Sequence, residues 1–111
     1  MAILFENNNG LGVVTITDPL TAVNVVVFRN QFVAWFQTEP DLKDVVIDFG
    51  GVRFMDSSGL GAVIGMLKHI SGRGGALTLA RPQRNVKQVF EITGADQMMT
   101  ICDTLEEAMA R

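Results

Sequence analysis

The sequence has very few of the residues that build metal centres and disulfides. Among its 111 residues there is one cysteine, Cys102, and one histidine, His69. A single cysteine excludes an intramolecular disulfide and any metal site made of several cysteines, and a single histidine leaves too few partners for a zinc site. We therefore expect no metal and no other cofactor. Cys102 lies in an apolar-flanked run, which indicates a buried small hydrophobic residue.

Basic clusters and long apolar runs are also missing. The net charge is −3 and the Lys and Arg residues are scattered, which argues against nucleic-acid binding driven by phosphate contacts. The longest apolar region, residues 22–36, is interrupted by Arg29, Asn30 and Gln31, so we expect no membrane insertion. The N-terminus has no basic lead and too short an apolar run for a signal peptide. A cytoplasmic protein is the default expectation.

What the chain does have is an alternation of strand-like and helix-like segments. Its 48% hydrophobic and 19% charged residues suit a globular protein, and its length suits a single domain, residues 1–111. The order β-β-α-β-α-β-α-β-α predicts an α/β fold with a mixed, mostly parallel sheet covered by helices. Strands are predicted at 2–6, 13–17, 44–49, 76–80 and 98–102, and helices at 21–38, 57–71, 83–93 and 104–110.

Apolar spacing predicts which residues form the core. Residues 21–38 contain three valines that favour a strand, but the aromatic residues recur with helical spacing, and Thr21 offers a cap. We interpret this aromatic stripe as core and not as a ligand platform. Gly61 and Gly65, four residues apart, predict close packing of the helix that contains them. The predicted core includes Phe28, Phe32, Trp35, Phe36, Leu60, Val63, Ile64, Leu67, Ile70, Val86, Val89, Phe90 and Ile92.

The segment most informative about function lies between the strand at 44–49 and the helix that follows it. Asp56 and Ser57 form a natural helix start, because their side chains accept hydrogen bonds from the free amides of a first turn. The same amides and the positive end of the helix dipole favour an anion. A phosphoryl group on a serine here would add about −1.5 to −2 charge near pH 7. Spacing alone leaves two interpretations open, a modification site and a simple cap.

The octet from Phe54 to Gly61, Phe-Met-Asp-Ser-Ser-Gly-Leu-Gly, resembles the signature of STAS-domain proteins, specifically the bacterial anti-sigma-factor antagonists. The likeness continues in order through residues 74–79, 86–90 and 93–95. The resemblance implies the STAS fold and a switch in which a partner kinase, itself an anti-sigma factor, phosphorylates the serine after the aspartate. That serine is Ser57 here. A serine phosphatase would reset the switch, and the partner-binding residues would be Asp56, Ser57, Ser58 and Gly59.

One position departs from the pattern of these antagonists. They usually have a Gly-x-Leu-Asp type sequence after the second strand, whereas Thr21 follows the leucine in this chain. Asp18 could substitute, but the proline that follows it makes the local geometry different. The departure concerns partner contacts next to the switch and so the identity of the kinase, and it leaves Ser57 unaffected.

An enzyme is not expected. A nucleophilic serine needs a base within hydrogen-bond reach, yet His69 lies 12 positions beyond Ser57 on the same predicted helix, about 18 Å away. The Gly-x-Ser-x-Gly elbow and the phosphate-binding loops of kinases and ATPases are absent. Two functions therefore stay open: a phosphorylation-switched anti-sigma-factor antagonist, and a constitutive STAS scaffold or small-ligand-binding module within a transport or signalling assembly.

Overall fold

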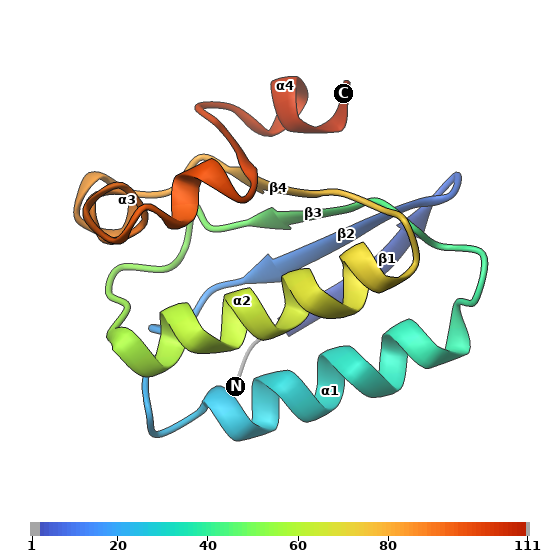
Figure 1. Ribbon diagram of the computed structural model, residues 1–111, viewed down its shortest axis with the longest axis horizontal. Helices are drawn as coiled ribbons and strands as arrows, with labels where there is room; N and C mark the ends of the chain where they lie inside the picture. The colour runs from blue at the N-terminus through green and yellow to red at the C-terminus, as the bar shows by residue number, and fades with distance from the viewer. Residues whose placement is uncertain (1–2, 111) are drawn as a thin grey trace.

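The computed structural model describes residues 3–110, which form a five-stranded sheet with α-helices packed around it (Figure 1). The α/β class and the predicted order of strands and helices are confirmed. Ala2, where the first strand was predicted to begin, lies outside the described residues. The elements are β1 (Ile3–Asn8), β2 (Leu11–Ile16), α1 (Val25–Thr38), β3 (Val45–Asp48), α2 (Ser57–Gly72), β4 (Leu77–Ala80), α3 (Arg84–Thr93), a 3-10 turn (Ala95–Gln97), β5 (Thr100–Cys102) and α4 (Leu105–Met109).

The strands lie side by side in sequence order, β1-β2-β3-β4-β5. β1 and β2 form an antiparallel hairpin whose turn places Asn9 and Gly10 at φ of 53° and 90°. Asn and Gly are the residues that tolerate positive φ in such turns. The pairs β2–β3, β3–β4 and β4–β5 are parallel. The carboxyl ends of β2, β3 and β4 therefore meet at one edge of the sheet, and the connections that leave them lie next to one another.

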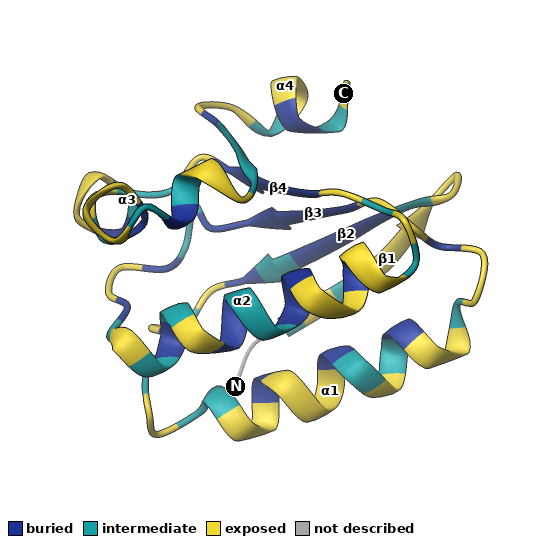
Figure 2. Ribbon diagram, in the orientation of Figure 1, coloured by how far each residue is buried: buried dark blue, intermediate teal, exposed yellow. Residues whose placement is uncertain are grey.

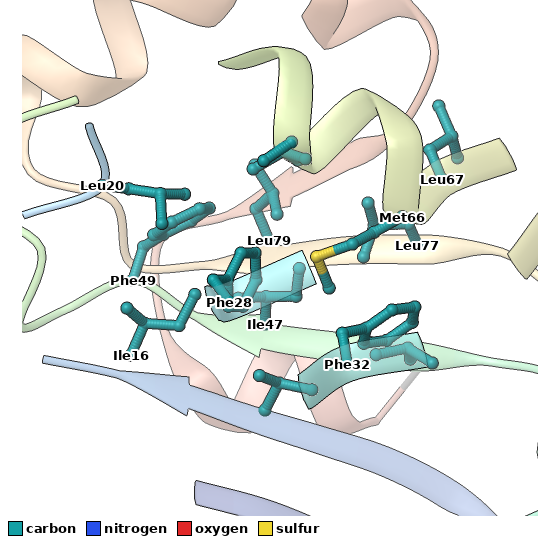
Figure 3. Close-up of a cluster of buried hydrophobic side chains, with 14 of the residues drawn as sticks. Ile16, Leu20, Phe28, Phe32, Ile47, Phe49, Met66, Leu67, Leu77 and Leu79 are labelled. Carbon is teal, nitrogen blue, oxygen red and sulfur yellow. The ribbon is translucent and has the colours of Figure 1, made fainter. Parts of the chain in front are cut away.

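The main core lies between the sheet and the helices α1 and α2 (Figures 2 and 3). Alternate strand residues point to opposite faces, so Ile47 packs in this core while Val46 belongs to a smaller cluster under α4. The aromatic stripe of α1 is confirmed as core, with Trp35 at its margin, stacked on Phe5 with 5.1 Å between ring centroids. Cys102 is buried in the smaller cluster, as predicted.

Four local predictions were wrong. Helix α1 begins at Val25, because Asn24 closes a preceding turn by accepting the Thr21 amide at 3.0 Å and donating to the Pro19 carbonyl at 2.6 Å. Strand β5 begins at Thr100, after the 3-10 turn. Ile92 is 84% exposed and takes no part in the core. The predicted close packing at Gly61 and Gly65 is also absent, since a Cβ atom at either would meet no heavy atom within 4 Å.

Within residues 3–110, no helix has both the length and the apolar character that crossing a bilayer requires.

Candidate functional site at the start of helix α2

The first turn of α2 is held by one aspartate that binds two segments of the chain. Asp56 is the N-cap, in an extended conformation, and its Oδ1 accepts a hydrogen bond from the Gly59 amide at 2.9 Å. Its Oδ2 accepts from the Ala22 amide at 3.1 Å, 34 residues earlier in the chain. The predicted capping role of Asp56 is therefore confirmed. The same side chain also fixes the connection between β2 and α1 against the helix start.

These contacts set the charge state of the cap. The amides of Gly59 and Ala22 donate to the carboxylate and lower the pKa of Asp56 from its usual value of 3.8. Hydrogen bonds to the charged form of an acid favour that form. Asp56 is therefore a fixed negative charge at neutral pH, directly before Ser57.

Gly59 is where α2 comes closest to the β2–α1 connection. A Cβ atom on Gly59 would overlap the Leu20 carbonyl oxygen and lie 2.6 Å from the Met55 side chain. Two backbone hydrogen bonds join the same segments, from the Leu20 amide to the Phe54 carbonyl at 3.0 Å and from the Asp56 amide to the Leu20 carbonyl at 3.3 Å. Gly59 is buried, so its role is to let the two segments pack closely, and it is not exposed to a partner.

The two serines differ in their access to solvent. Ser57 is exposed as the first residue of a 16-residue helix, whereas Ser58 is half-buried. A group transferred to Ser57 would therefore meet solvent at the positive end of the helix dipole. Of the two hydroxyls, that of Ser57 is the more accessible to a modifying enzyme.

Four exposed apolar side chains belong to the two chain segments that meet at the start of α2, and we call them the apolar rim. The rim comes from two segments that Asp56 holds together. One is the β2–α1 connection together with the first turn of α1, and the other consists of the residues just before α2. Helices α1 and α2 begin at the same end of the molecule (Figure 1), and the first turn of α1 contains exposed residues (Figure 2). The rim consists of Val23, Val26, Val27 and Phe54, which are 93%, 55%, 46% and 53% exposed.

The rim was not predicted from the sequence. The valines were assigned to a helix of the core, and Phe54 was noted only as part of the octet. Phe54 alone could have indicated the rim, because it is a large apolar residue in a connection between a strand and a helix. Exposed patches of this kind are typical of interaction sites.

The remaining reactive side chains lie away from this site or in the core. His69 is exposed on α2, 12 residues beyond Ser57, which at 1.5 Å per residue is about 18 Å along the helix axis. Cys102 is buried. No group of three or more His, Cys, Asp or Glu residues between positions 3 and 110 could hold a metal ion. The site therefore consists of a capped helix start, an exposed hydroxyl and an apolar rim.

This fold, with a serine at the start of α2, defines the class of protein. The family model of the STAS domain matches residues 2–108, and the chain belongs to this family. Among curated relatives, it is 40% identical over 58 residues to a candidate anti-sigma factor antagonist of Thermotoga maritima, a match that covers 52% of this chain and 51% of the relative. The match thus spans about half the length of that relative. The anti-sigma-B factor antagonist of Bacillus subtilis is 29% identical over 96 residues, 86% of this chain and 84% of the relative.

Solved structures agree with this assignment. The crystal structure of a candidate anti-sigma factor antagonist from Thermotoga maritima superposes with a TM-score of 0.90 at 25% identity, covering 97% of this chain and 92% of that one. The Bacillus cell-fate determinant SpoIIAA in its phosphorylated form gives a TM-score of 0.74 at 25% identity, covering 99% and 98% of the two chains. The chain thus has the STAS fold and resembles bacterial anti-sigma factor antagonists over most of its length.

Proposed function

We propose that this protein is an anti-sigma factor antagonist controlled by phosphorylation of Ser57. In its unphosphorylated form it binds an anti-sigma factor through the helix start and the apolar rim, and the anti-sigma factor releases its sigma factor. That partner is also a serine kinase, which transfers the γ-phosphoryl group of ATP to the Ser57 oxygen. A serine phosphatase removes the phosphate by hydrolysis.

The observation that carries the proposal is the position of Ser57. Residue Ser57 is exposed at a helix N-terminus, where the positive end of the helix dipole favours an anion. Fixed structure beneath it, from the Asp56 cap and the buried Gly59, allows the modification to change the surface while the fold stays the same. The relatives named as anti-sigma factor antagonists support the partner class.

The apolar rim explains how a phosphate would act on binding. A complex formed over Val23 and Phe54, which are largely exposed in the free protein, removes water from their surroundings. A phosphoserine of about −1.5 to −2 charge would then either lose its hydrating water at a cost in free energy or prevent the two surfaces from closing. It would also lie next to the Asp56 carboxylate, a like charge. A loss of about 2–3 kcal/mol would weaken the complex roughly 30- to 150-fold.

A reconstituted reaction tests the proposal. The protein is incubated with ATP and an anti-sigma factor kinase from its own genome, and the modified residue is located by mass spectrometry. We expect phosphate on Ser57, no phosphate on Ser57→Ala, and normal modification of Ser58→Ala, the matched control from the same turn. Phosphate on Ser58 in the wild-type protein would refute the assignment of the site.

A second measurement separates the switch from a constitutive STAS scaffold. Phosphosite occupancy is measured on protein isolated from its native host during growth and stress, with phosphatases inhibited. The proposed switch requires occupancy at Ser57 that changes between conditions. A fully covered peptide with no phosphate in any condition would favour the constitutive module.

A further inference from the structure

Three polar side chains that follow β4 bind the end of β3 and the connection between β3 and α2. Arg81 donates from Nε and Nη2 to the two carboxylate oxygens of Asp48, both at 2.8 Å. Gln83 donates from Nε2 to the Gly50 carbonyl at 3.1 Å. Asn85 donates from Nδ2 to the Arg53 carbonyl at 2.8 Å. We call Arg81, Gln83 and Asn85 the clasp.

The clasp is anchored firmly at Arg81. Asp48 is only 3% exposed at the end of β3, and a two-bonded pair with arginine fixes both partners in orientation. Arg81 adopts a φ of 46°, which is uncommon for a residue other than glycine. Its own amide donates to the Cys102 carbonyl at 2.8 Å. The side chain also fills the space over Gly50, where a Cβ atom would lie 2.5 Å from the arginine Nε.

The segment that the clasp holds is the one that presents Phe54 and leads into Ser57. On its other side the same segment is bonded to the β2–α1 connection, through the Leu20 amide on the Phe54 carbonyl. Residues 50–56 therefore lie between two neighbouring connections, both at the carboxyl edge of the sheet. Asn85 binds Arg53, one residue before Phe54, so its contact is the nearest of the clasp to the rim.

We propose that the clasp is a positioning element for partner binding, with Asn85 as its most direct member. By binding the Arg53 carbonyl, Asn85 fixes the position of Phe54 relative to Val23 and Ser57. The docking surface thus depends on residues 81–85, which do not belong to the signature octet and need not touch the partner. The claim that the clasp affects docking of the partner, the docking half, rests on the proposed function. The claim that the clasp fixes the position of residues 50–56, the positioning half, does not.

Asn85→Asp separates positioning from stability. The substitution keeps the size of the side chain, removes the N–H donor and places an oxygen against the Arg53 carbonyl. Asn85 is the second residue of α3, where a negative charge is favourable to the helix, so global stability should hold or rise. The control is Gln88→Glu, the same amide-to-carboxylate change at an exposed position on the same helix.

The first readout needs no partner. Hydrogen exchange of the Leu20 amide, which donates to the Phe54 carbonyl, is followed by NMR in the isolated proteins, with urea unfolding measured alongside. We expect exchange about 2- to 10-fold faster in Asn85→Asp than in Gln88→Glu, as the loss of one hydrogen bond implies, at an equal or higher urea midpoint. Equal exchange rates in the two variants would overturn the positioning role, and so would faster exchange accompanied by a proportional loss of global stability.

The second readout is the affinity of the unphosphorylated protein for its anti-sigma factor. We expect Asn85→Asp to weaken binding by about 2- to 10-fold relative to Gln88→Glu. Unchanged affinity with a loosened Leu20 amide would overturn the docking half. If the wild-type protein bound no anti-sigma factor, the proposed function would fail together with that half, and the exchange experiment would still decide whether the clasp positions the segment.

Discussion

The starts of helices α2 and α4 use the same local chemistry and differ in everything around it. Asp56 caps α2 by accepting a hydrogen bond from the Gly59 amide, and Thr104 caps α4 by accepting one from the Glu107 amide at 3.1 Å. In both, the donor lies three residues after the acceptor. At α4 the partner of the cap is also local, since the Thr104 hydroxyl donates to the Glu107 carboxylate. At α2 the second carboxylate oxygen binds Ala22, 34 residues away.

The difference shows how a cap can join segments that are distant in the sequence. A local cap stabilises its own helix and could be removed without moving another segment. The cap of α2 joins two connections, and these two connections carry the residues of the apolar rim. Substitutions at long-range contacts should therefore cost more than substitutions at local ones.

The closest contact at the α2 start should be the least tolerant of change. Gly59→Ala places a methyl group against the Leu20 carbonyl and Met55, and we expect a net loss of about 2–3 kcal/mol in the free energy of unfolding, as for overpacked interiors. Gly61→Ala, two residues on and facing open space, should instead gain up to about 1 kcal/mol from helix propensity. Urea denaturation of both variants measures the difference. Equal effects would show that the approach to Leu20 does not constrain the helix.

Helix C-termini show the same contrast. α1 ends on a side chain from the end of α2, because Arg73 donates to the carbonyls of Phe36, Glu39 and Leu42 and lies 3.5 Å above the Phe36 ring. α3 ends locally on Gly94 at φ 78°. Arg73→Ala should lower the free energy of unfolding by about 2 kcal/mol. Arg73→Lys should recover only part of this, since one ammonium cannot replace the planar fork. Full recovery by lysine in thermal or urea unfolding would contradict the geometric role.

Local signals account for what the sequence could predict. Asp56 was predicted as a helix start, and the predicted helices 83–93 and 104–110 end just before Gly94 and begin at Thr104, because capping chemistry acts over three or four residues. The order of elements was predictable for the same reason, since apolar periods of 2 and 3.6 are read within one segment. The start of α1 was missed because the turn before it depends on the Asn24 side chain, which competes with a helix begun at Thr21.

Long-range contacts account for what the sequence could not predict. The predicted site residues Asp56, Ser57, Ser58 and Gly59 are consecutive and lie together necessarily, whereas Val23 is brought near them by long-range bonds, from Ala22 to Asp56 and from Leu20 to Phe54. The clasp joins residues 32 or 33 positions apart, a separation at which no local pattern exists. Gly61 and Gly65 illustrate the opposite error, a spacing that suggested close packing where the fold leaves open space.

A smaller effect is expected at the local cap. Thr104→Ala removes the acceptor of the Glu107 amide, and we expect a loss of about 1 kcal/mol in the free energy of unfolding. The rate of Ser57 phosphorylation should stay unchanged, because no contact of Thr104 reaches the α2 start. Urea unfolding and a kinase assay on the same variant test both statements. A slower phosphorylation would reveal a coupling between α4 and the site that the hydrogen bonds do not show.

The smallest effect distinguishes the two caps by pH. Asp56 has a pKa below 3.8, the value expected for it in the unfolded chain, because its charged form accepts from Gly59 and Ala22. Its contribution to stability is therefore fully present above that unfolded-state value and is lost as the pH falls through the lower folded value. We expect the Gly59 and Ala22 amide resonances to follow one common titration in this acidic range, with a midpoint below 3.8. Asp56→Asn should abolish the titration at both amides and leave the Glu107 amide as it is in the wild-type protein. Separate midpoints for Gly59 and Ala22 would mean that two different groups hold them, and the two-segment role of Asp56 would then be wrong.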